Sequence, residues 1–160
     1  MSPSATPKPD HNPIEIFISF SHKDDALQEE LVTHLSGLRR RGKITAWYDR
    51  AVEAGEEWEA QIKSKLESAQ IILMLISPAF MASDYCYDIE MQRAMARHDA
   101  GTARVIPVIL RPCDWKDSPF GKLKAMPEDG KPVTQWSDRD EAFLNAVQGI
   151  RRALESLSKK

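Results

Sequence analysis

Hydrophobic positions follow two alternating patterns along this chain, short apolar runs and stripes at helical spacing. The first run, at residues 14–18, is typical of a β-strand and ends in a polar segment at residues 19–22. The next apolar positions recur at helical spacing and predict a helix: they are Leu27, Leu31, Leu35 and Leu38. Acidic residues open this stripe, and three arginines followed by Gly42 close it, as the helix dipole and a left-handed C-terminal residue favour. The pattern predicts a strand, a turn and a helix.

The same alternation continues through the middle of the chain. Residues 44–48 predict a short strand and residues 49–56 a loop, and the next helical stripe consists of Trp58, Ile62 and Leu66. Residues 71–76 are apolar at every position, which predicts a strand covered by helices on both faces, hence the central strand of a parallel sheet. A loop beginning at Ser77-Pro78 and a helix over residues 83–98 are expected after it.

The last third of the chain is less regular. Residues 104–110 predict a fourth strand, and Pro107 moves it towards an edge or a bulge because proline lacks the ladder donor. Residues 112–132 are irregular, and Val133-Thr134 is expected to form a short fifth strand. A closing helix capped near Ser137 is expected from the apolar positions Phe143, Val147, Ile150, Leu154 and Leu157.

Strands that alternate with helices of this length predict an α/β fold, a flavodoxin-like doubly wound parallel sheet of about five strands with helices on both faces. Residues 1–13 are rich in proline and polar residues and are expected to form a flexible tail before one domain at residues 14–158. Such sheets bind ligands at the carboxyl ends of their strands. Chemistry is therefore expected in residues 19–22, 49–55 and 77–84, and on the helix that follows.

Composition and charge narrow the function. The chain has 160 residues, which suits one domain, and its net charge of -2 is spread without a basic stripe, so nucleic acid is not an expected partner. The only cysteines, Cys86 and Cys113, have no CxxC spacing, which argues against a disulfide framework and a metal site. The strongly apolar runs are too short to span a bilayer, so we expect a cytoplasmic protein without membrane contact.

Three motifs begin at or near the carboxyl ends of the first three predicted strands. They are Phe17-Ile18-Ser19-Phe20-Ser21 with Asp24 and Asp25, Trp47-Tyr48-Asp49 with Gly55 and Trp58, and Ser77-Pro78 with Ser83-Asp84-Tyr85-Cys86 and Glu90. Taken singly, each could be an ordinary strand end, loop or helix cap. In this order and spacing, over residues 15–115, they resemble the successive motifs of the Toll/interleukin-1 receptor (TIR) domain family.

The resemblance to bacterial-type enzymatic members implies an activity and a site. In those members the glutamate on the helix after the third strand is the essential acid of NAD hydrolysis or cyclisation, and Glu90 matches it. The resemblance also implies that Phe20 and Trp47 offer apolar surface to the nicotinamide or its ribose, and that Ser21, Asp49 and Ser77 line the cleft. Four residues before Glu90, the family often has tryptophan where this chain has Cys86, so Tyr85 or Tyr87 is expected to supply the aromatic surface. Tyr85 and Cys86 are accordingly expected among the NAD-binding residues. Cys86 itself is expected to be a packed residue and not a nucleophile, because no histidine or lysine lies near it in the chain.

NAD would be the substrate and no cofactor is expected, since no Gly-x-Gly-x-x-Gly follows the first strand. The resemblance implies that the complete site forms between TIR domains of a homo-oligomer or filament. The self-association loop would contain Arg50, Val52, Gly55 and Trp58. An assembly-activated effector of prokaryotic antiviral defence is the role that the resemblance implies, with linear ADP-ribose and a cyclic isomer both open as products.

Two other functions compete with this one. Without the resemblance, Tyr85, Ile89 and Ala96 could form the buried stripe of the helix. Glu90 would then lie off this stripe, solvated and paired with Arg93 or Arg97. A non-catalytic TIR–TIR interaction module would then be the function. A phosphoacceptor receiver domain is disfavoured, because Ser77-Pro78 and not an aspartate ends the third strand.

Overall fold

The protein's structure is a computed structural model that describes residues 12–48 and 58–158. Its centre is a parallel sheet of four strands in the order β2-β1-β3-β4. The strands are β1 (Ile14–Ser19), β2 (Ile44–Trp47), β3 (Ile71–Ile76) and β4 (Arg104–Ile109). Every residue of β3 is buried, and β3 pairs with both β1 and β4. The α/β class and the interior position of β3 are confirmed.

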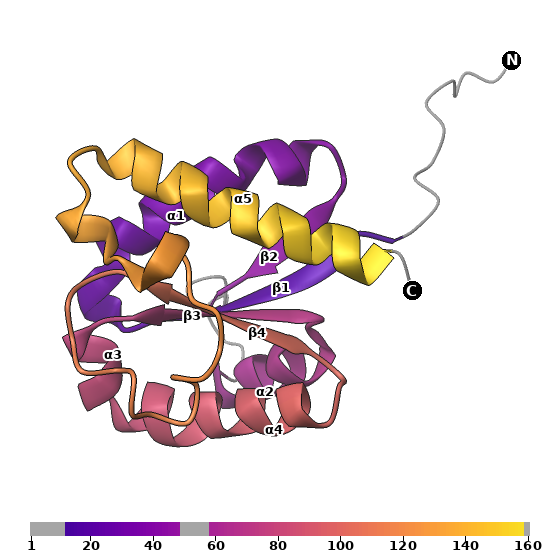
Figure 1. Cartoon of the computed structure of the whole chain (residues 1–160). Helices are drawn as coiled ribbons and strands as arrows, with labels where there is room; N and C mark the ends of the chain where they lie inside the picture. Colours follow the sequence, from indigo (N-terminus) through magenta and orange to yellow (C-terminus); the bar gives the residue numbers. More distant parts are fainter. Residues whose placement is uncertain (1–11, 49–57, 159–160) are drawn as a thin grey trace, which may run out of the picture.

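Helices cover both faces of the sheet (Figure 1). On one face lie α1 (Asp25–Arg40) and α5 (Arg139–Ser158), and on the other lie α2 (Trp58–Ser68), α3 (Pro78–Ala82) and α4 (Gln92–Asp99). A core cluster fills each interface, because alternate residues of every strand face opposite sides. A short 3-10 turn, η1 (His22–Asp24), leads into α1, and Gly42 follows that helix with φ 71°, as the sequence predicts. No helix of the described residues is long and apolar enough to cross a membrane.

The backbone donors on the outer edge of β4 are occupied. Arg104 and the residue after the strand, Leu110, donate towards β3, so the alternate donors of Val105 and Ile109 face outward. The Val105 amide donates to Nδ1 of His98 at 3.1 Å, and the Ile109 amide donates to the Met126 carbonyl at 2.8 Å. Pro107 lies between them and has no donor. The expectation that Pro107 belongs to an edge strand is confirmed.

Residues 133–134 do not form the expected fifth strand. They begin a 3-10 helix, η5 (Val133–Gln135), shortly after another, η4 (Glu128–Gly130). The Thr134 amide donates to the Leu110 carbonyl, beyond the end of β4, while Met126 already forms a β-bridge with Val108 along the β4 edge. With that edge occupied and Pro132 directly before the segment, no ladder can form.

The segment after β3 also differs from the expected loop and regular helix. Residues 78–82 form the short helix α3, and Ser77 caps it by accepting from the Phe80 amide at 3.0 Å. A π-helix, η3 (Asp84–Met91), then precedes α4, with Ser83 accepting from the Cys86 amide at 3.1 Å. The predicted helix at residues 83–98 therefore exists, but its first half is wound as i→i+5 turns.

Candidate functional site

Buried polar side chains are concentrated at one end of the sheet. The buried polar or charged residues of the described chain are Ser19, Asp24, Gln28, Ser77, Glu90 and Arg97. Ser19 ends β1, Asp24 lies in the following turn and Ser77 follows β3, so these three lie where the strands present their carboxyl ends. Polar groups are rarely buried without partners, and a concentration of them at the ligand-binding edge of a parallel sheet indicates a site.

Glu90 is at the centre of this site. Only 5 % of the residue is exposed, and the Ser19 hydroxyl, itself buried, donates to Glu90 Oε1 at 2.5 Å. The alternative of a solvated glutamate off the core face is therefore wrong. The two arginines proposed as its partners bind elsewhere: Arg93 pairs with Glu67, and Arg97 binds backbone carbonyls of α2 and of Thr102.

The π-helix explains why the expected core stripe was misplaced. The i→i+5 hydrogen bonds widen the turns and shift the phase of the buried face, so Ile89 is 54 % exposed and Ala96 is exposed as well. Cys86 and Glu90 do lie on one side of the helix, as their spacing suggests. The Cys86 thiol donates to the Phe20 carbonyl at 3.4 Å, so both side chains contact the carboxyl end of β1.

A second buried group joins the ends of three segments. The Ser77 hydroxyl donates to Asp24 Oδ2, and Arg111 Nε donates to Asp24 Oδ1 at 3.0 Å. Asp24 follows β1, Ser77 follows β3 and Arg111 follows β4. The Asp24 side chain is 2 % exposed, whereas the Arg111 side chain is 37 % exposed. The carboxylate is thus a buried anchor for a guanidinium that reaches solvent.

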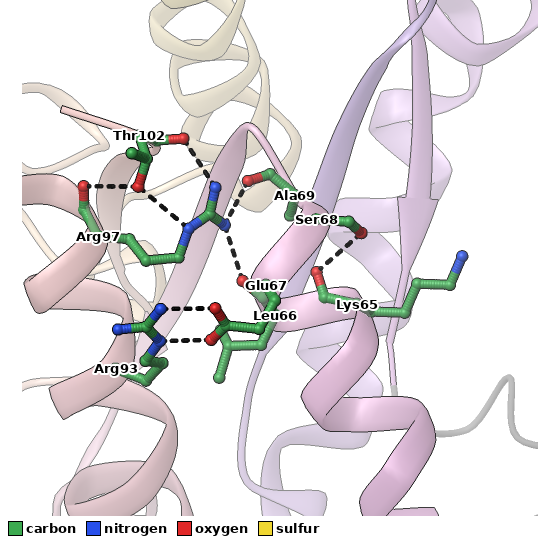
Figure 2. Close-up of polar contacts among 8 residues, drawn as sticks. All are labelled: Lys65, Leu66, Glu67, Ser68, Ala69, Arg93, Arg97 and Thr102. Atoms are coloured by element: carbon green, nitrogen blue, oxygen red, sulfur yellow. Dashed lines mark hydrogen bonds and ion pairs between the residues drawn. The ribbon is translucent and has the colours of Figure 1, made fainter. Parts of the chain in front are cut away.

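An ion pair and a buried arginine fix α4, which directly continues the π-helix of Glu90, to its neighbour α2 (Figure 2). Arg93 forms a bidentate pair with Glu67, and this hydrogen bond is the main reason that the pKa of Glu67 is lowered from its ordinary value. Arg97 Nη1 donates to the carbonyls of Leu66 and Ala69 at 2.8 and 2.6 Å, at the C-terminal end of α2. Its Nη2 donates to the Thr102 carbonyl at 2.7 Å, which ties the turn before β4 to the same point.

The other predicted site residues have mixed positions. Trp47 is half-buried and stacks on Phe17, with 5.5 Å between the ring centroids. Because Phe17 lies two residues before Ser19 on the same strand, both side chains are on the Glu90 side of the sheet. Tyr85 and Tyr87 are half-buried against the core cluster of that same side. Ser21 caps η1, accepting from the Lys23 amide at 3.3 Å.

Two predicted cleft residues are structural in this conformation. The Phe20 ring is 4 % exposed and packs in the core cluster on the α1 and α5 side, so only its carbonyl approaches the Glu90 helix. Ser77 is fully buried and its hydroxyl serves Asp24 and the α3 cap. Neither side chain offers surface to a ligand, because burial removes both from contact with solvent.

The predicted self-association loop lies largely outside the described residues. This holds for Asp49, Arg50, Val52 and Gly55, while Trp58 is the first residue of α2. Their roles remain predictions.

Both cysteines are free thiols. Burial is the largest influence on Cys113 and raises its pKa, against the opposing charge of Arg111. Within residues 12–48 and 58–158, no three His, Cys, Asp or Glu side chains come together to hold a metal ion.

Sequence reasoning placed Ser19 in a segment expected to carry chemistry but gave it no role of its own, and it missed Arg111. Strand alternation offered a signal for Ser19, because it places Phe17 and Ser19 on one face at the carboxyl end of β1. Arg111 directly follows the fourth apolar run, a position equivalent to the other strand ends.

Comparison with known proteins identifies the class. Residues 16–148 match the TIR domain family, and the chain belongs to that family. It is 54% identical over 138 residues to the uncharacterized protein y4lF of Sinorhizobium fredii (strain NBRC 101917 / NGR234), covering 86% of this chain and 43% of that protein. The chain therefore spans less than half the length of this relative.

Solved structures agree on the fold. The TIR domain of the Toll-related receptor TRR-2 from Hydra magnipapillata superimposes with a TM-score of 0.62 and 19% identity, covering 88% of this chain and 97% of that one. The TIR domains of the activated Roq1 resistosome recognizing the effector XopQ give a TM-score of 0.49 and 20% identity over 59% of this chain and 56% of that one. The first similarity supports the flavodoxin-like TIR architecture, and the second is too low to add to it.

Proposed function

We propose that this TIR domain cleaves NAD at the bond between nicotinamide and ribose, with Glu90 as the catalytic residue. The observation that supports the proposal is a carboxyl side chain 5 % exposed at the carboxyl edge of a parallel sheet, receiving a hydrogen bond from a buried serine. A glutamate that served only solubility or a surface ion pair would remain solvated. Burying it is costly, so a functional reason is expected.

The chemistry requires one well-placed negative charge. Nicotinamide leaves as a neutral molecule from a cationic pyridinium, so no general acid is needed. The ribosyl group passes through an oxocarbenium-like transition state, which a carboxylate stabilises as it does in glycosidases. Glu90 supplies that charge where few water dipoles screen it. Attack by water gives ADP-ribose, and attack by the substrate's own adenine gives a cyclic isomer.

Substrate access links this activity to assembly. Because Glu90 is nearly covered in this structure, NAD reaches it only when neighbouring segments move. A site completed by a second TIR domain would supply that rearrangement, in keeping with an effector activated by oligomerisation in antiviral defence.

The decisive experiment is NAD consumption by concentrated protein, with products separated by chromatography. We expect the parent to release nicotinamide and Glu90→Gln to lose turnover by about 10²- to 10³-fold, because glutamine keeps the size but not the charge. Glu67→Gln is the matched control, since Glu67 is a half-exposed glutamate paired with Arg93 on the neighbouring helix. It should consume NAD at the parental rate.

Two results would contradict the proposal. If Glu90→Gln melts like the parent and still consumes NAD at the parental rate, Glu90 is not catalytic. If the parent never consumes NAD even when assembled, the non-catalytic interaction module replaces the enzyme.

A further inference from the structure

The hydrogen bonding and exposure of Arg111 are not fully explained by a role in neutralising the charge of Asp24. Its Nε donates to Asp24 Oδ1 at 3.0 Å, and the other oxygen of that carboxylate accepts from Ser77. Ser77 and Arg111 therefore fix the carboxylate of Asp24 from two sides, and this carboxylate in turn fixes the guanidinium of Arg111. The Nη groups of Arg111 have no hydrogen-bond partner among the described residues, and 37 % of the side chain is exposed.

The guanidinium of Arg111 lies at the carboxyl end of the sheet, where parallel sheets bind ligands. Arg111 follows β4, and the Ser19 that binds Glu90 ends β1. In the order β1-β3-β4 these strands are two positions apart, about 10 Å at ordinary strand spacing. Gln28, one helical turn after Asp24, is buried with its Nε2 lacking a partner within residues 12–48 and 58–158, so this corner has a further unmet donor.

We propose that Arg111 is an anion-binding residue and that it takes the diphosphate of a dinucleotide whose ribose lies at Glu90. This inference rests on the proposed function for the identity of the ligand. The diphosphate of NAD is attached to the 5′ carbon of the nicotinamide ribose, so it lies beyond that ribose and needs a cation at some distance from the catalytic carboxylate. A guanidinium whose Nη donors have no partner in the described part of the chain suits two phosphate oxygens, and its anchoring by Asp24 lowers the entropy cost of ordering a long side chain.

The test compares two ligands that share the scissile bond, NAD and nicotinamide riboside, which has no phosphate. Binding is measured by calorimetry on concentrated Glu90→Gln protein, with and without Arg111→Gln, so that cleavage does not interfere. We expect Arg111→Gln to weaken NAD binding by about 10- to 100-fold and to leave nicotinamide riboside within about twofold. Inorganic pyrophosphate should compete with NAD only when Arg111 is present.

Two control variants separate recognition from folding. Arg104→Gln changes an arginine at the opposite end of the same strand and should leave both affinities unchanged. If Arg111→Gln fails to fold because Asp24 is left buried and unpaired, Asp24→Asn combined with Arg111→Gln removes both charges and allows the same comparison.

Unchanged NAD affinity, no measurable NAD binding, or an equal loss for both ligands would overturn the assignment, since Arg111 would then only support the fold. NAD binding that depends on Arg111 in a protein that never cleaves NAD would leave the anion site standing and remove the proposed enzyme. The two proposals therefore fail separately.

Discussion

The Ser19 hydroxyl influences the charge and orientation of Glu90. It donates to Oε1 at 2.5 Å from a residue that is itself buried, so the carboxylate is held in one rotamer with part of its charge compensated. Ser19 thus acts through Glu90 and is a positioning residue in the proposed reaction.

Ser19→Ala should lower the turnover of NAD by about tenfold and change KM little, because one hydrogen bond to a charged group is lost. Steady-state kinetics on the purified variant measure both constants. Ser156→Ala, an exposed serine on α5, is the control and should behave as the parent. A Ser19→Ala protein with parental turnover, or with a loss confined to KM, would contradict this role.

Burial also predicts a chemical property of Cys113. Its pKa is raised chiefly by desolvation, so a smaller fraction of the thiol is ionised at a given pH than in an exposed cysteine. Alkylation by iodoacetamide at pH about 8, where a free cysteine is partly ionised, should be slower in the folded protein than in denaturant. Mass spectrometry of the peptide containing Cys113 measures the rate, and equal rates in the two states would refute the prediction.

At the residue scale, the sequence predicted the identity of the central carboxylate but not its surroundings. Glu90 was indicated by the resemblance to the TIR family, since the residues alone also allowed a solvated glutamate, and its partner Ser19 lies 71 positions earlier in the chain. Contacts of that separation follow from strand order and helix phase, which one sequence does not reveal. The burial of Phe20 and Ser77 could not be predicted for the same reason, because it depends on which helix covers each strand end.

At the element scale, α4 owes its position to two arginines of different kinds. Arg97 is buried and its guanidinium satisfies carbonyls of α2 and of the turn before β4, whereas Arg93 is half-exposed and pairs with Glu67 (Figure 2). Loss of Arg97 would leave several buried carbonyls without a donor, which is costly. Loss of Arg93 would expose its partner to water at little cost.

Arg97→Met should therefore lower the free energy of unfolding by about 3 kcal/mol, as measured by urea denaturation. Arg93→Gln on the same helix is the matched control and should change it only slightly. If the two substitutions were equally mild, the buried hydrogen bonds of Arg97 would not stabilise the packing of α4.

The same pair of helices gives a pH dependence. Arg93 lowers the pKa of Glu67, so the pair stabilises the fold fully above the pKa of an unfolded glutamate and loses that contribution as pH falls through the lowered value. The parent and Arg93→Gln should thus converge in stability in acid and differ slightly at neutral pH. A difference that grew in acid would show that the pair is not the cause.

Periodicity predicted the strands and long helices well because each has one face or both faces buried, which fixes the spacing of apolar residues. It did not predict the π-helix at Asp84–Met91, whose winding depends on tertiary contacts such as that of Cys86 with Phe20. It also gave a fifth strand at Val133-Thr134, where apolar and β-branched residues pack as a 3-10 turn because Met126 occupies the sheet edge.

At the scale of the whole molecule, the covered position of Glu90 predicts that activity depends on association. If the proposed site is completed by a second domain, specific NAD cleavage should rise with protein concentration or on crowding. A dilution series assayed together with light scattering would measure both activity and oligomeric state. Constant specific activity from a protein that stays monomeric throughout would contradict the composite site.

The occupied backbone donors on the outer edge of β4 restrict how copies of this domain could polymerise. Its outward amides are taken by His98 and Met126, and Pro107 has none, so an incoming strand would find no donors there. A sheet that continues from copy to copy needs two edges that can pair with another strand, and in the described sheet only the β2 edge remains available for such pairing. Strand addition would thus terminate at a pair, and a longer fibre of native domains has to propagate through side chains of helices and loops.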